Sequence, residues 1–110
     1  MNYRTTRIYV LSLEVVDLVA GAVAGMPSGL GFLADQLRRA AASITLNFVE
    51  GCGRSSTADR IRFFTMAIGS AHEVAGAFEV MHRFKALTAE DLSTAHDHCD
   101  HLIAMLRKFT

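Results

Sequence analysis

Apolar residues recur every three or four positions along four segments of the 110-residue chain, which is the spacing of an amphipathic helix. The predicted helices cover about residues 7–24, 31–50, 57–85 and 89–108. In the second segment the apolar stripe comprises Leu33, Leu37, Ala41, Ile44 and Phe48. No segment shows the sustained alternation of a strand. The pattern predicts an all-α protein with one domain over residues 1–110, folded as an antiparallel, up-down-up-down four-helix bundle.

Residues that break helices lie in clusters between these segments. The only proline, Pro27, lies in a glycine-containing stretch that separates the first helix from the second. Gly51 and Gly53 are interpreted as turn residues that end the second helix, because glycine is common at helix C-termini. A phosphate-binding loop is the weaker interpretation of these glycines, since no strand precedes them and no Lys-Ser/Thr pair follows. Ser56 and Thr88 are predicted to cap the third and fourth helices, each with an aspartate three residues later.

The third predicted helix has two apolar stripes. One comprises Ile61, Phe64, Ile68, Ala71, Ala75 and Phe78. The other comprises Phe63, Ala67, Ser70, Val74, Ala77, Met81 and Phe84. A helix with two apolar sides needs two partners. One partner is its own bundle, and we expect the other to be a neighbouring subunit.

Composition supports self-association. Hydrophobic residues make up 51% of the chain, and the mean hydropathy is +0.26. A chain this short buries a smaller fraction of its surface than a large one. The surplus apolar surface must therefore be covered by a membrane or by another chain. Glu14 and Asp17 interrupt the longest apolar stretch, which argues against a membrane span, and no signal peptide is evident. We expect a cytoplasmic protein whose two cysteines, Cys52 and Cys99, stay reduced.

The charge balance bears on nucleic-acid binding. Eleven basic and 11 acidic residues give a formal net charge of zero, whereas nucleic-acid-binding proteins usually carry a basic excess. A local basic patch remains compatible with this balance. The candidate RNA-binding residues are Arg38, Arg39, Arg54, Arg60 and Arg62. The pair Phe63 and Phe64 follows Arg62 and either stacks on RNA bases or packs in the core, and helical spacing favours the core.

Polar residues also line one side of the second helix. Ser43, Asn47 and Glu50 follow one another at intervals of one turn, between apolar neighbours. A partly buried carboxylate needs a cation, which one of the arginines can supply. These residues form either an ion-pair network that fixes helix packing or part of a ligand site, and the structural interpretation is favoured.

Residues 96–101 contain three histidines and two aspartates, which suggests a metal site. His101 follows Asp97 by four residues, a spacing that zinc pairs use. No third and fourth ligand is evident, so a solvated polar face is the favoured interpretation, and we expect no metal and no cofactor. The sequence also lacks a nucleophile elbow and the Glu-x-x-His pairs of di-iron bundles. We therefore expect a protein that is not an enzyme.

The central segment resembles a known family. The residues that carry the resemblance are Leu37-Arg38-Arg39-Ala40-Ala41, Ser43-Ile44, Asn47, Glu50-Gly51, Gly53-Arg54, Ser56, Arg62-Phe63, Ala67, Gly69-Ser70 and Glu73. They are similar to the four-helix bundle proteins associated with intervening sequences in 23S ribosomal RNA genes. The same family includes the accessory variability determinant of diversity-generating retroelements. The match covers roughly residues 31–74, and it departs from the family pattern at Thr45, where proline is usual, and at Arg60, where an aromatic residue is common.

The resemblance implies a bacterial, cytoplasmic protein that assembles into a ring-shaped homopentamer. It also implies an association with 23S ribosomal RNA, either as an RNA-binding protein or as a scaffold. The structural polar network expected on this basis comprises Ser43, Asn47, Glu50, Ser70 and Glu73. The expected partners are the protein itself, ribosomal or other RNA, and a further protein. The alternative function is a protein–protein adaptor that binds no nucleic acid.

Overall fold

The computed structural model describes residues 2–110 and contains four long helices and no strand within that range. The long helices are α1 (Arg7–Ala24), α2 (Gly31–Gly53), α3 (Thr57–Arg83) and α4 (Ala89–Arg107). Two short 3-10 helices, η1 (Tyr3–Thr5) and η2 (Ser28–Leu30), precede α1 and α2. The all-α, four-helix prediction is therefore confirmed. None of the helices in the described range combines the length and apolar character needed to cross a membrane.

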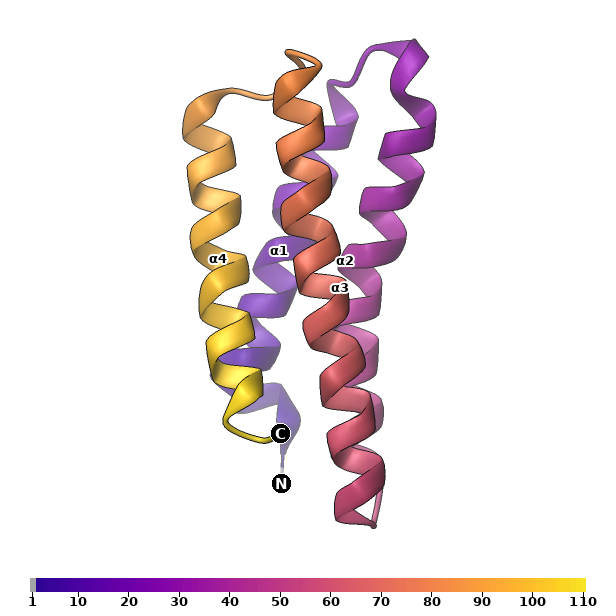
Figure 1. Cartoon of the computed structure of the whole chain (residues 1–110), viewed down its shortest axis with the longest axis vertical. Helices are drawn as coiled ribbons and strands as arrows, with labels where there is room; N and C mark the ends of the chain where they lie inside the picture. Colours follow the sequence, from indigo (N-terminus) through magenta and orange to yellow (C-terminus); the bar gives the residue numbers. More distant parts are fainter. Residues whose placement is uncertain (1) are drawn as a thin grey trace.

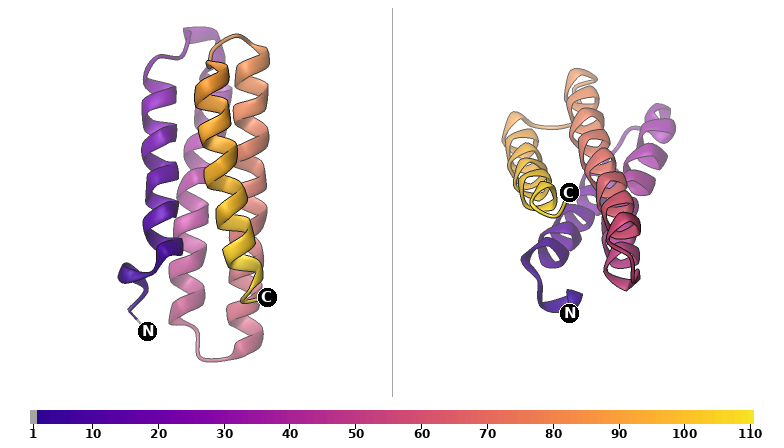
Figure 2. Two further views of the ribbon diagram at one scale, coloured as in Figure 1. Left: turned by 90° about the vertical axis from the view of Figure 1, so that its left-hand side faces the viewer. Right: turned by 60° about the horizontal axis from the view of Figure 1, so that its bottom comes forward.

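The four helices lie side by side in an elongated molecule of 44 × 23 × 19 Å (Figure 1). Each helix packs against two others, α2 against α3 most extensively and α1 against α4 least among the four pairs. The α1–α2 and α3–α4 connections lie at one end of the molecule. The α2–α3 connection lies at the other end, and both chain termini lie towards that end as well (Figures 1 and 2).

Side-chain caps begin the helices. The hydroxyl groups of Thr6, Ser56 and Thr88 accept hydrogen bonds from backbone amides at the starts of α1, α3 and α4, over 3.2, 3.1 and 3.1 Å. The caps predicted at Ser56 and Thr88 are therefore present. Helix α3 ends at Arg83, two residues earlier than expected, because Lys85 adopts a left-handed backbone conformation with φ 62°. A left-handed residue cannot continue a right-handed helix.

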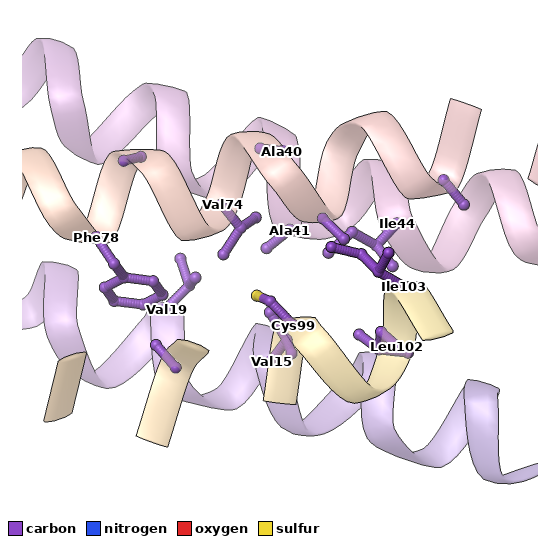
Figure 3. Close-up of a cluster of buried hydrophobic side chains, with 14 of the residues drawn as sticks. Val15, Val19, Ala40, Ala41, Ile44, Val74, Phe78, Cys99, Leu102 and Ile103 are labelled. Atoms are coloured by element: carbon purple, nitrogen blue, oxygen red, sulfur yellow. The ribbon is translucent and has the colours of Figure 1, made fainter. Parts of the chain in front are cut away.

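Residues from all four helices meet in the core. Figure 3 shows Val15 of α1, Ala41 of α2, Val74 of α3 and Cys99 of α4 pointing into one interior. The whole apolar stripe predicted for α2 is buried. On α3 the buried line draws on both predicted stripes and comprises Phe64, Ala67, Ala71, Val74, Ala77, Phe78 and Met81. The outer members of those stripes, Phe84 among them, remain partly or largely exposed.

One buried polar contact joins α1 to α2. The Thr45 hydroxyl donates to Ser12 Oγ over 2.9 Å, and the Ser12 hydroxyl donates to the carbonyl oxygen of Tyr9 over 2.7 Å. Both side chains are buried, so this short chain of hydrogen bonds satisfies groups that have lost contact with water. Thr45 lies where the family that this sequence resembles usually has proline. Its hydroxyl therefore has a structural role that a proline could not fill.

Candidate functional site

The end of the molecule that carries the α2–α3 connection is strongly basic. We call it the basic end and define it as residues 2–8, 50–64 and 105–110, which lie towards that end in Figure 1. Its seven basic residues are Arg4, Arg7, Arg54, Arg60, Arg62, Arg107 and Lys108. It contains only two acidic residues, Glu50 and Asp59, so its formal charge is +5. The rest of the chain carries four basic and nine acidic residues. Although the net charge is zero, positive charge is therefore concentrated at one end of the molecule and negative charge predominates elsewhere.

Three of the predicted arginines surround the α2–α3 connection. The guanidinium groups of Arg54 and Arg62 lie over the ring of Phe63, 4.8 and 4.4 Å from its centre. Arg60 Nε donates to the carbonyl oxygen of Arg54 over 2.7 Å, which holds its side chain back towards the end of α2. The buried Nε of Arg54 has no hydrogen-bond partner within the described chain, so Phe63 packing and the nearby Glu50 hold this side chain.

Acidic neighbours offset part of this charge. Arg54, which follows α2, lies 3.5 Å from Glu50 of α2, and Arg62 lies 3.7 Å from Asp59 of the same helix, α3. All four side chains are partly exposed. Exposed pairs of this kind contribute little to stability and leave the guanidinium accessible to another anion. Arg60 has no acidic partner within residues 2–110.

The other two predicted arginines lie elsewhere. Arg38 of α2 lies 16 positions before Arg54, about 24 Å along a helix, and it pairs with Asp35 over 3.3 Å. Arg39 is exposed beside it. The five arginines therefore do not form one patch. The structure adds Arg4, Arg7, Arg107 and Lys108 to the three at the connection. The expected up-down-up-down order could have predicted this grouping. With an even number of helices, the last helix ends at the same end of the bundle as the start of the first.

The predicted polar network is brought together only in part. Asn47 Nδ2 donates to the carbonyl oxygen and to Oγ of Ser43 over 2.9 and 2.8 Å, and the Ser70 hydroxyl donates to Ser43 Oγ over 2.8 Å. These three half-buried residues join α2 to α3. Glu50 lies outside the cluster with Arg54, and Glu73 accepts a hydrogen bond from Gln36. Glu73 forms no ion pair with an arginine among the described residues.

Gly51 has a packing role, so its interpretation as a turn residue was wrong. Helix α2 continues through Gly53, and no glycine in the described residues has a positive φ. A Cβ atom on Gly51 would lie 2.6 Å from Cε1 of Phe64, closer than atoms can approach. The ring of Phe64 is also held by Phe48, with ring centres 5.6 Å apart. The missing side chain at position 51 therefore lets α3 cross α2 closely beside the arginine cluster.

The two thiols lie in different surroundings. Burial raises the pKa of the Cys99 thiol to about 12, and the charge of Asp100 acts in the same direction. Burial also raises the pKa of the half-buried Cys52 thiol, and the positive charge of Arg60 opposes that effect. Neither cysteine is disulfide-bonded, and neither has the lowered pKa typical of a catalytic thiol.

The histidines of α4 point to different carboxylates. His98 lies 3.4 Å from Glu14 of α1, His96 lies 4.0 Å from Glu79 of α3, and His101 lies 3.8 Å from Asp97. Within residues 2–110 no three His, Cys, Asp or Glu side chains converge closely enough to hold a metal ion. The side chains of residues 96–101 therefore point in different directions, towards α1, towards α3 and along the exposed side of α4.

Comparison with known proteins adds a family and a fold. The sequence profile of the family described as "23S rRNA-intervening sequence protein" matches residues 4–108. The fold is similar to the crystal structure of a protein with unknown function from the S23 ribosomal protein family of Bacteroides thetaiotaomicron VPI-5482, with a TM-score of 0.82 and 21% sequence identity. That alignment covers 90% of this chain and 94% of the other. No curated protein matches the chain.

The packing role of Gly51 predicts opposite effects for two neighbouring glycines. Gly51→Ala should lower the free energy of unfolding by about 1–3 kcal/mol, because the new methyl group overpacks against Phe64. Gly53→Ala is the matched control, because nothing lies within 4 Å of its Cβ position. It should be neutral or stabilising by less than about 1 kcal/mol. Urea denaturation followed by circular dichroism measures both, and equal stability of the two variants would contradict this role.

Proposed function

The chain belongs to the family of 23S rRNA-intervening sequence proteins, and from this premise we propose that it is a non-enzymatic, self-associating scaffold whose basic end contacts ribosomal RNA. The proposal places the protein in the bacterial cytoplasm. The observation that carries it is the separation of charge along the bundle, with seven basic residues and two acidic residues at one end. Electrostatic attraction to phosphates depends on such local charge and not on the net charge of the chain.

The arginine–phenylalanine cluster supplies the chemistry for RNA contact. Arg54 and Arg62 stack on Phe63, which pre-orders two flat guanidinium groups at the surface. Guanidinium groups bind phosphate with paired hydrogen bonds and also stack on unpaired bases. Arg60 adds a charge without an acidic neighbour in the described chain. This combination suits single-stranded or looped RNA better than a regular duplex.

Self-association is supported by exposed apolar side chains on α2 and α3. Leu46 and Phe32 of α2 are 65% and 63% exposed, and Val80 and Phe84 of α3 are also exposed. Gly69 and Gly76 of α3 are exposed too, with nothing within 4 Å of either Cβ position. Exposed apolar side chains on neighbouring helices mark a surface that can contact another protein chain. Of these residues only Phe84 belongs to the second stripe predicted for α3, whose members Ala67, Val74, Ala77 and Met81 are buried within the bundle itself.

The proposed assembly is a ring of antiparallel, up-down-up-down bundles, a homopentamer by analogy with the family. In a ring with cyclic symmetry the basic ends occupy equivalent positions, and they face the same side if the bundles stand along the ring axis. Several weak RNA contacts would then act together, which raises the overall affinity without any stronger individual contact. A neutral subunit can bind RNA in this way.

One observation favours an alternative function, a protein–protein adaptor that binds no nucleic acid. Arg38, Arg54 and Arg62 each have an acidic neighbour three or four residues away in the sequence. Those pairs reduce the charge available to phosphates, whereas the exposed apolar residues of α2 and α3 remain available to any protein. The two functions differ in whether nuclease treatment releases the partner.

The RNA contact predicts a difference between two triple variants with the same change in net charge. Arg54→Gln, Arg60→Gln and Arg62→Gln together should weaken binding to a 23S ribosomal RNA fragment and reduce the salt slope by about 2. The control combines Arg38→Gln, Arg39→Gln and Arg83→Gln, which lie outside the basic end. A gel-shift titration at several salt concentrations measures both, with circular dichroism to verify folding. Equal losses in the two triple variants, or no binding by the unaltered protein at low salt, would contradict the RNA contact.

Self-association predicts that a charge on the α2 surface dissociates the assembly. Leu46→Glu should yield a monomer with unchanged helix content, because Leu46 is exposed in the single chain. Ala104→Glu on the exposed side of α4 is the matched control and should remain assembled. Light scattering coupled to size-exclusion chromatography measures the mass of each. A monomeric unaltered protein at high concentration would overturn the proposed scaffold.

A further inference from the structure

A pocket opens at the basic end where all four helices contribute. Its volume is 520 Å³, within the range of about 300–1,000 Å³ that small-molecule sites occupy. Ile8 of α1, Phe48 of α2, Phe64 of α3 and Met105 of α4 form its apolar floor. Phe109 follows α4 and forms a wall, with its ring centre 5.9 Å from that of Phe64. A cavity with this floor favours an alkyl or aromatic group over a polar one.

Three cationic side chains line the same pocket. Arg7 lies at the start of α1, Arg60 near the start of α3 and Lys108 just after α4, and all three line the pocket. None forms an ion pair with an acidic side chain in residues 2–110, and no acidic residue lines the pocket. Three uncompensated positive charges around a weakly polarisable cavity attract an anion and repel a cation.

The remaining polar groups of the pocket are few. The Thr6 hydroxyl caps α1, donating to the carbonyl oxygen of Tyr3 over 2.7 Å and accepting from the amide of Tyr9. The Cys52 thiol is the other polar group, and it is half-buried. A ligand with many polar groups would therefore lose its hydrogen bonds to water without replacement. A single anionic group beside the three cations can exchange its water contacts for charged hydrogen-bond donors.

We propose that this pocket binds an alkyl chain that ends in one anionic head group, of which a long-chain carboxylate is the simplest example. The alkyl chain lies on the aromatic and aliphatic floor, and the head group lies among Arg7, Arg60 and Lys108. The proposal rests on the pocket and not on the RNA contact, since a phosphate backbone by itself would leave the apolar floor uncovered. The same chemistry is present in a free fatty acid and in a lysophospholipid whose head group is anionic.

Cys52 provides a built-in reporter of occupancy. Its thiol lies on the pocket wall, whereas Cys99 is fully buried in the bundle core and serves as an internal reference. Dodecanoate below its micelle concentration should slow the alkylation of Cys52 by iodoacetamide severalfold and in a saturable way, as measured by mass spectrometry. Dodecanol should protect less, because it lacks the charge. A dodecyl lysophospholipid tests the second source of the same chemistry.

Chain length and charge variants test the two halves of the site separately. Between hexanoate and decanoate the affinity should rise about fourfold for each added methylene group. Arg60→Gln and Lys108→Gln should each weaken dodecanoate binding by about threefold to fivefold. Arg83→Gln removes one charge at the other end of the bundle and should leave binding unchanged. Circular dichroism verifies that the variants fold, and Lys108, which lies beyond α4, provides a rim variant outside every helix.

Three results would overturn the proposal. They are an absence of Cys52 protection by dodecanoate, equal protection by dodecanoate and dodecanol, and equal weakening by Arg83→Gln and Lys108→Gln. RNA binding is scored independently by gel shift. A protein that binds no RNA but shows the expected protection retains this site and loses only the proposed RNA contact.

Discussion

The close packing of α2 against α3 is the contact on which the rest of the structure depends. Only residues 54–56 connect these two helices, and they pack more extensively than any other pair. Gly51 allows the close approach near the connection, and the hydrogen bonds among Ser43, Asn47 and Ser70 join the helices further along. This pair fixes the position of Phe63 and Phe64, and with them the arginine cluster and the floor of the pocket. Helices α1 and α4 then complete the core and bring the chain termini to the same end.

Because both chain termini lie near the α2–α3 connection, a chain with no net charge folds into a molecule with one strongly positive end. Basic residues near both chain ends and around the α2–α3 connection are far apart in sequence, and only the fold gathers them. A formal net charge of zero describes the sum and not the distribution, and phosphates respond to the local field. The same gathering places three cations around an apolar pocket. The RNA-directed surface and the pocket therefore overlap at the basic end and share Arg60.

Much of the fold could be predicted from the sequence because helical periodicity is a local property. The stripe from Leu33 to Phe48 identified the buried side of α2, and Ser56 and Thr88 identified the starts of α3 and α4. Gly51 could not be interpreted correctly, since glycine at a helix end and glycine at a close helix crossing look alike in sequence. Only the position of Phe64 distinguishes the two roles. The buried Ser12–Thr45 hydrogen bond and the full set of basic-end residues likewise depend on which helices become neighbours.

Cross-linking tests most directly whether the basic end is the surface that contacts RNA. The protein would be irradiated in complex with a 23S ribosomal RNA fragment, and the cross-linked peptides would be identified by mass spectrometry. Cross-links are expected within residues 2–8, 50–64 and 105–110. Cross-links confined to the opposite end, at residues 25–31 and 84–90, or to the region around Arg38 and Arg39, would contradict this expectation.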